Sequence, residues 1–263
     1  MSLLRVFPDA DALGDSLAAD ILAGVAAAAE RGRRYLLGCP GGRSLLPTYE
    51  AVAARLSDAP IDLSHVVIVM MDDYLTDAPG AVRRVSTGAR HSCERFGRER
   101  IAEPWSRAVP AGRGIAPDHV WLPDPHDPEA YDGRIAAAGG IDLFLLATGA
   151  SDGHVAFNPP GSDIAGRTRV IRLADSTRRD NLATFPHFGT LEKVPRRGVS
   201  VGLKTIAGLS RRVRLVATGP TKAASVARVL ATDGWEPDWP ATVVHECRDA
   251  GLWADQAAAG VSR

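Results

Sequence analysis

The sequence lacks an excess of charge of either sign. Its 31 basic residues (Lys and Arg) equal its 31 acidic residues (Asp and Glu) in number, so its formal net charge at pH 7 is zero. Nucleic-acid-binding domains usually carry a basic excess or a basic patch, so this balance argues against a nucleic-acid partner. An anionic ligand must then be held by a few local groups rather than by the overall charge.

Cysteine is also scarce. Cys39, Cys93 and Cys247 are odd in number, lie far apart and show no CxxC spacing. Disulfide frameworks and zinc sites need pairs or closely spaced groups of cysteines, so neither is indicated here. Three dispersed thiols instead fit a reducing compartment such as the cytosol.

Long apolar runs are missing as well. The apolar stretch near the N-terminus, within MSLLRVFPDAD, is too short for a signal peptide. No uninterrupted apolar run approaches the roughly 20 residues that span a bilayer. Together with the cysteine usage, these absences predict a cytoplasmic protein without a membrane partner.

What the sequence does contain is the pattern of an α/β domain. Its 45% hydrophobic and 24% charged residues are ordinary for a globular chain. Short apolar runs typical of buried parallel strands alternate with helical patterns. These runs lie at residues 35–39, 66–71 and 143–146, and a later strand is expected at 213–217. We therefore predict a mostly parallel sheet covered on both faces, within a single domain over residues 1–263.

Some less regular segments are also assigned from the sequence. Residues 76–84, which contain Asp, Pro and Gly, are expected to form a loop, and a helix is expected over about 85–95. The stretch 104–118 is rich in Pro, Gly and Arg and is expected to be a long surface excursion. A last strand is expected at about 241–245.

The stretch IDLFLLATGASDGHVAFNPPG, residues 141–161, carries the strongest chemical signal. A buried strand breaks at Thr148-Gly149 into a loop that holds Asp152 and His154. Ligands of open α/β sheets bind beyond the carboxyl ends of the strands, and histidine suits proton transfer near neutral pH. The pair is therefore a candidate catalytic acid–base system; the alternative is a polar loop that merely ends a strand.

Two turns have the features of a phosphate site. After the strand at 35–39, Gly41, Gly42, Arg43 and Ser44 precede a helical stretch, and such a turn can present backbone N–H groups and a helix N-terminus to an anion. Lys222 lies in the first turn of a later helix, where its charge opposes the helix dipole and so favours an anion contact. A lone Gly-Gly pair also fits an ordinary tight turn.

Acidic residues follow another buried strand. Asp72 and Asp73 come directly after the apolar run at 66–71. A carboxylate at a strand's carboxyl end is a candidate general base, although two solvated loop carboxylates would have the same sequence.

Taken together, these segments resemble the glucosamine-6-phosphate deaminase (isomerase) and 6-phosphogluconolactonase superfamily, and more closely its deaminase branch. The resemblance rests on a set of motifs in a fixed order, which span nearly the whole chain. They are LGCPGG at 37–42, MMDDY at 70–74, DGHVAFN at 152–158, RTR at 167–169, DSTRRDN at 175–181, VPRRGVSVGLKTI at 194–206 and GPTKA at 219–223. The resemblance implies a doubly wound, Rossmann-like three-layer fold that acts on a sugar phosphate without metal or other cofactor.

The resemblance also implies roles for the candidate residues. Asp72 would move a proton between C1 and C2 of the opened sugar, and His154, supported by Asp152, would open the pyranose ring. The loop from Gly41 to Ser44 and Lys222 would hold the phosphate. Homo-oligomerisation is left open.

Two positions depart from the deaminase pattern. Pro159 occupies the place of a glutamate that supports the ring-opening histidine, and Ala183 that of an arginine that grips the phosphate. From Pro159 we expect weak or absent ammonia release, and Arg43 is a candidate to replace the charge missing at Ala183. Two alternatives stay open: a 6-phosphogluconolactonase-type hydrolase, and a non-catalytic sugar-phosphate-sensing module.

Overall fold

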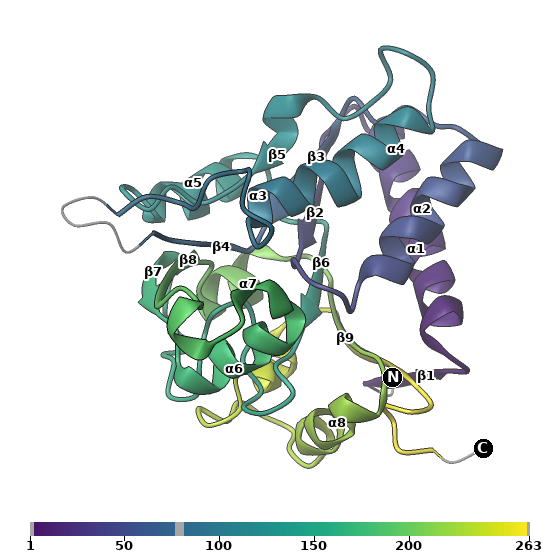
Figure 1. The fold of residues 1–263 in the computed structure, drawn as a ribbon. Coiled ribbons are helices and arrows are strands. Elements are labelled where there is room, and N and C mark those ends of the chain that lie inside the picture. The colour runs from purple at the N-terminus through teal and green to yellow at the C-terminus, as the bar shows by residue number, and fades with distance from the viewer. Residues whose placement is uncertain (1–2, 77–81, 262–263) are drawn as a thin grey trace.

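The computed structural model describes residues 3–76 and 82–261 (Figure 1). Part of the loop expected at 76–84 therefore lies outside the described residues. The main sheet has seven strands in the order β1-β10-β9-β6-β2-β3-β5, and every neighbouring pair is parallel. The strands are β1 (Leu4–Phe7), β2 (Tyr35–Cys39), β3 (Val66–Met70), β5 (Val120–Trp121), β6 (Leu143–Ala147), β9 (Val213–Ala217) and β10 (Ala250–Asp255).

Helices cover both faces of this sheet, as Figure 1 shows. The α-helices are α1 (Ala10–Glu30), α2 (Leu46–Asp58), α3 (Cys93–Phe96), α4 (Glu103–Arg107), α5 (Glu129–Ala137), α6 (Asp175–Thr184), α7 (Leu203–Leu209) and α8 (Ala223–Leu230). A π-helical segment, η1 (Gly97–Ala102), joins α3 to α4. The 3₁₀ segments are η2 (Pro117–His119), η3 (Pro186–Phe188), η4 (Leu191–Lys193), η5 (Pro220–Lys222) and η6 (Pro240–Glu246).

The strands divide their side chains between two apolar cores. Along β2, Tyr35, Leu37 and Cys39 lie in the core beneath α1, α2 and α4, whereas Leu36 lies in the core beneath α5, α7, α8 and η6. This alternation is the expected consequence of the two-residue period of a strand. It explains why the central strands are apolar throughout, and it confirms the predicted doubly wound, three-layer α/β class.

Helix α1 is long and apolar enough to cross a membrane by length and composition, although no uninterrupted apolar run of that length was expected. Its side chains show what the apolar residues do. Leu13, Leu17, Ile21 and Val25 form one buried stripe in the first core, because residues four apart lie on the same face of a helix. The polar residues Asp11, Asp15 and Asp20 interrupt the other faces.

A second, three-stranded antiparallel sheet was not predicted. Its strands are β4 (Asp72–Tyr74), β8 (Arg197–Ser200) and β7 (Arg169–Arg172), in the order β4-β8-β7. The acidic residues that follow β3 are therefore strand residues rather than loop residues: Asp72 pairs with Ser200, and Asp73 with Val199. This pairing fixes the backbone that carries the candidate base.

The prediction of a helix over 85–95 is wrong for most of that segment. Residues 85–92 form turns and extended backbone, and α3 begins only at Cys93. The reason is a local cap, because the Ser92 hydroxyl accepts a hydrogen bond from the Arg95 N–H at 3.2 Å. The expected excursion at 104–118 begins inside α4, where Trp105 is buried and its Nε1 donates to the Tyr49 carbonyl at 2.9 Å.

The prediction of a final strand at 241–245 is also wrong. Those residues belong to the 3₁₀ segment η6, whose apolar side chains pack into the second core. The strand that completes the sheet, β10, follows at Ala250–Asp255 and lies between β1 and β9. A short apolar run does not by itself distinguish a strand from a buried helical turn.

Leu17→Ala should lower the free energy of unfolding by about 3 kcal/mol, because it leaves a cavity in the first core. Leu22→Ala on the same helix, where the side chain is only partly buried, should cost about 1 kcal/mol or less. Urea unfolding monitored by circular dichroism measures both values. Equal, small effects would show that the buried stripe of α1 does not contribute to the core as described.

Candidate functional site

A cavity of about 140 Å³ opens at the carboxyl ends of the central strands. β2 lies between β3 and β6, each about 4.8 Å away. After β2 the chain forms β3 and β5 on one side of it, and then β6, β9 and β10 on the other side. Such a topological switch point is where open α/β sheets bind ligands. Seven of the eight predicted site residues line the cavity: Gly41, Gly42, Arg43, Ser44, Asp72, His154 and Lys222. The eighth, Asp152, is buried and hydrogen-bonded to His154.

The loop between β2 and α2 forms a wall with the features of an anion site. Gly41, Gly42, Arg43 and Ser44 all line the cavity, and the backbone N–H groups of such a loop can bind an anion. The first residues of α2 contribute less, because the Leu46 N–H donates to the Arg43 carbonyl at 3.2 Å and Pro47 has no N–H. Gly42 has φ = 93°, a left-handed conformation that glycine adopts at little cost. The Arg43 guanidinium donates to the carbonyl oxygen of Ala183 at 3.5 Å. It thus lies beside the position that the resemblance associates with a missing arginine.

Lys222 enters the cavity from the turn after β9. Its Nζ donates a short hydrogen bond to the carbonyl oxygen of Thr148. Burial lowers the pKa of Lys222, while the carboxylates of Asp180 and Asp152 oppose this shift. Arg90 also lines the cavity, so cations from several segments of the chain surround it.

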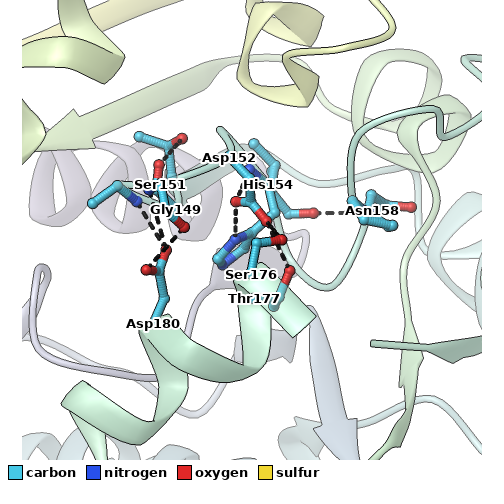
Figure 2. A network of polar contacts seen from close by, with 12 residues as sticks. Gly149, Ser151, Asp152, His154, Asn158, Ser176, Thr177 and Asp180 are labelled. Atoms are coloured by element: carbon cyan, nitrogen blue, oxygen red, sulfur yellow. Dashed lines mark hydrogen bonds and ion pairs between the residues drawn. The ribbon is translucent and has the colours of Figure 1, made fainter. Parts of the chain in front are cut away.

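Asp152 and His154 form a tight pair on the loop after β6 (Figure 2). The Nδ1 of His154 lies 2.6 Å from Asp152 Oδ1, and the other carboxylate oxygen accepts from the hydroxyls of Ser176 at 2.5 Å and Thr177 at 3.1 Å. Burial alone would raise the pKa of Asp152. The hydrogen bond and charge of His154 and the bond from Ser176 outweigh burial and hold that pKa well below its usual range.

Gly149 allows this pair to lie against the loop backbone. A Cβ atom at position 149 would come within 2.1 Å of His154 Nδ1 and 2.5 Å of Asp152 Oδ1. No side chain therefore fits there while the pair keeps its place. A backbone hydrogen bond also closes this loop, because the Gly149 N–H donates to the His154 carbonyl at 2.8 Å.

Asp72 is a buried carboxyl group that still faces the cavity. Burial raises its pKa to about 7, and the neighbouring charge of Asp73 acts in the same direction, against a hydrogen bond from Cys93. The Cys93 Sγ lies 3.3 Å from Asp72 Oδ1. A carboxyl group with a pKa near neutrality can both take up and release a proton at physiological pH.

The adjacent Asp73 has a different position. It does not line the cavity, and its Oδ1 accepts from the backbone N–H groups of Tyr74 and Cys93, each at 2.9 Å. Asp73 therefore orders the chain between β4 and α3. The resemblance gave the proton-transfer role to Asp72 alone, and the structure shows that the two neighbouring carboxylates have different surroundings.

The sequence analysis missed α6 as a source of site residues. Asp180 and Asn181 line the cavity, and Asp180 accepts hydrogen bonds from the loop that carries His154. The Nδ2 of Asn181 is buried and has no hydrogen-bond partner within the described residues. The signal that could have indicated Asp180 is the i, i+4 spacing of Ser176 and Asp180, which places both polar side chains on one face of the helix.

One group of the described residues could approach a metal ion. Potential ligand atoms of Asp152, His154 and Asp180 all lie within 4.8 Å of one another. Asp152 and His154 are, however, already bonded to each other, and Asp180 is bonded to Ser151. A metal would have to compete with these hydrogen bonds, so the group fits proton transfer better than metal binding.

Comparisons with known proteins agree with this arrangement. Residues 8–253 match the family described as glucosamine-6-phosphate isomerases/6-phosphogluconolactonase. The chain is 36% identical over 228 residues to a glucosamine-6-phosphate deaminase of Streptomyces avermitilis, with 86% of this chain and 79% of that protein covered. It is 34% identical over 260 residues to that of Mycolicibacterium smegmatis, with 97% and 90% covered. The chain therefore belongs to this family.

Solved structures agree in fold. A monomeric glucosamine-6-phosphate deaminase superposes with a TM-score of 0.82 at 24% identity, covering 99% of this chain and 100% of the other. A 6-phosphogluconolactonase from Shewanella baltica gives 0.68 at 18% identity, covering 97% and 98%. At these identities the likeness establishes the shared fold, not the reaction.

Asp72→Asn should change how the stability of the chain depends on pH. The folded pKa of Asp72, about 7, exceeds the unfolded value of about 3.9, so the native state favours the protonated form. Its contribution is complete below about pH 4 and is lost as the pH rises to about 7, by a few kcal/mol. Urea unfolding over this pH range should show a smaller loss for Asp72→Asn than for the wild type.

The exposed Asp58 provides the control for this measurement. Asp58→Asn removes one carboxylate at the protein surface, so it measures the effect on the unfolding curves of losing a single acidic residue that is not buried. Parallel curves for Asp72→Asn and the wild type would contradict the proposed burial of an ionisable Asp72.

Proposed function

We propose that this family member opens the ring of a hexose phosphate or amino-hexose phosphate and isomerises it between aldose and ketose. The observation that carries the proposal is the meeting of three groups in one cavity. These are the buried Asp72, the Asp152–His154 pair and the cationic loop after β2. The activity named for the relatives, glucosamine-6-phosphate deaminase, supports the same class of substrate.

His154 has the contacts required of a ring-opening residue. With Nδ1–H donated to Asp152, the other ring nitrogen, Nε2, is left to act on the substrate. It accepts the proton of the anomeric hydroxyl and returns a proton to the ring oxygen as the C1–O bond breaks. The Asp152 carboxylate stabilises the imidazolium that exists between these two transfers.

Asp72 has the burial and pKa required for the following step. In its ionised form it removes the proton from C2 of the open-chain aldose, a proton moves from the C2 oxygen to the C1 oxygen of the resulting enediolate, and the protonated carboxyl delivers its proton to C1, which yields the ketose. For an amino sugar the same transfer yields the imine at C2, which becomes the ketose when water adds and ammonia leaves. A pKa of about 7 keeps both forms accessible near neutral pH. The single residue can therefore serve both halves of the transfer.

The phosphate end of the substrate fits the wall formed by the loop from Gly41 to Ser44 and by Lys222. This wall offers two cations, Arg43 and Lys222, and the backbone of a glycine-containing loop, the combination that favours a dianionic phosphate. The chain has no net charge to attract such a ligand, so these local groups carry its recognition.

The expectation of weak ammonia release rested on Pro159, which offers His154 no carboxylate. The structure adds a second carboxylate near His154 from another element, since Asp180 belongs to the group of ligand atoms that lie within 4.8 Å of one another. The expectation therefore loses part of its basis and stays a prediction for measurement.

The wild-type chain should convert at least one hexose phosphate or amino-hexose phosphate to its ketose. A panel of such compounds in deuterated solvent, followed by NMR, measures ketose formation and deuterium exchange at C2, and a coupled assay measures ammonia. Hydrolysis of a phosphogluconolactone with no isomerisation of any aldose would instead establish the lactonase alternative. Binding of the panel without any turnover would indicate the sensing module.

Asp72→Asn is the matched variant for this assay. It should reduce exchange at C2 by a factor of about 10² to 10⁴, the usual contribution of a general base. His154→Gln should impair the cyclic sugar more than an open-chain analogue. Retention of C2 exchange in Asp72→Asn would remove Asp72 from the mechanism.

Lys222→Ala should raise KM for the phosphosugar roughly tenfold to a hundredfold, because one charge-assisted hydrogen bond to phosphate is lost. Binding of the unphosphorylated sugar should be nearly unchanged. Lys204→Ala, at a lysine that does not line the cavity, serves as the control. Equal weakening of both ligands by Lys222→Ala would show that the lysine supports the loop at Thr148 instead.

A further inference from the structure

Asp180 presents a carboxylate to the cavity from α6. Its Oδ1 accepts from the Ser151 hydroxyl at 3.0 Å, and its Oδ2 from the N–H groups of Ala150 at 3.1 Å and Ser151 at 3.4 Å (Figure 2). A carboxylate has about four acceptor positions, so these bonds leave one for a ligand. The residue is half-buried and lines the cavity together with His154.

The Asp180 carboxylate is unfavourable for a site that binds only a phosphate. Its charge acts on Lys222, where it is the strongest of the charges that oppose the lowered pKa. The contacts of the Asp180 carboxylate within the described part of the chain are hydrogen bonds from neutral donors, not ion pairs. A negative charge beside a phosphate-binding lysine weakens the binding of any ligand that is only anionic.

The loop contacts do not require this charge. An asparagine in the same position could accept from the N–H groups of Ala150 and Ser151 through its Oδ1 and hydrogen-bond to the Ser151 hydroxyl through its amide. The hydrogen bonds therefore do not account for the negative charge, and within the described residues no basic side chain forms an ion pair with it. A substrate that carries both a phosphate and an ammonium group would supply such a partner.

We propose that Asp180 receives the ammonium group of an amino-sugar phosphate and makes this cavity favour amino sugars over neutral sugar phosphates. The proposal rests on the proposed function, which assigns the phosphate to Arg43 and Lys222 and the ring oxygen to His154. In the substrate, C1 carries the ring oxygen and is bonded to C2, which carries the amino group. A carboxylate within 4.8 Å of a His154 ligand atom is thus placed to reach that amino group.

Asp180→Asn should affect an amino-sugar phosphate differently from two ligands that carry only phosphate charge. In calorimetry at slightly acidic pH, where the amine is protonated, glucosamine 6-phosphate should bind about tenfold more weakly than to the wild type, because a charge-assisted hydrogen bond becomes a neutral one. Glucose 6-phosphate and inorganic phosphate should bind equally well or up to about fivefold more tightly, because a repulsive charge near Lys222 is gone.

Ser151→Ala is the matched control, because it removes one hydrogen bond to Asp180 and keeps the charge. It should leave the ratio of the affinities for the amino and neutral sugars unchanged. If Asp180→Asn weakens all three ligands equally and lowers the Tm, Asp180 only holds the loop, and the proposal is overturned. If Asp180→Asn leaves the ratio of the affinities for the amino and neutral sugars unchanged and does not lower the Tm, the proposal is overturned as well.

These measurements also separate this proposal from the proposed function. Wild-type turnover of a phosphosugar, combined with an unchanged affinity ratio in Asp180→Asn, would contradict only the role of Asp180. A wild-type chain that isomerises no sugar in the panel would contradict the proposed function, while the ligand affinities would still test whether Asp180 selects the amine.

Discussion

The carboxylate of Asp152 is the interaction on which the rest of the site depends. It accepts from the ring and the backbone N–H of His154 and from the hydroxyls of Ser176 and Thr177. These bonds join the loop after β6 to the first turn of α6. Because α6 is a rigid helix, docking its first turn also places Asp180, one turn later, against the same loop (Figure 2). One buried anion with several donors thus sets the orientation of the histidine and the position of a second carboxylate.

A second constraint is the burial of Asp72. Its strand β4 pairs with β8 in the small antiparallel sheet, which holds the carboxyl group where water reaches it poorly. The cost of ionising a poorly solvated group raises its pKa to about 7, and the Cys93 thiol limits this cost by donating a hydrogen bond. Burial destabilises the folded chain at neutral pH but supplies the proton affinity that acid–base chemistry requires. The site therefore combines a strongly acidic carboxylate, Asp152, with a weakly acidic one, Asp72.

The two departures from the deaminase pattern are offset to different extents by residues elsewhere in the chain. The guanidinium of Arg43 reaches the carbonyl of Ala183, so a cation is present beside the position where the resemblance expects one. Near His154, Asp180 offers a carboxylate that Pro159 cannot. In both cases the charge comes from another part of the chain, and only the way in which α6 packs over the loops brings it to the site. The charge at a site therefore depends on all the side chains that pack around it, not only on the residue at one position of the sequence pattern.

The sequence by itself determined the layered fold and identified seven residues of the cavity wall. Continuous apolar runs such as Tyr35–Cys39 can satisfy both faces of a strand only in a covered parallel sheet, and parallel strands bring their carboxyl ends, with the loops of Asp72 and His154, to one edge. The tertiary structure decided what depends on contacts between distant segments. It made the residues after β3 a strand, through pairing with β8, and it moved the last strand to β10 because the apolar residues of η6 fill the second core instead. It also gave Asp72 and Asp73 different surroundings and brought Asp180 to the loop that carries His154, since which side chains are buried and which segments meet depends on the packed fold rather than on local spacing.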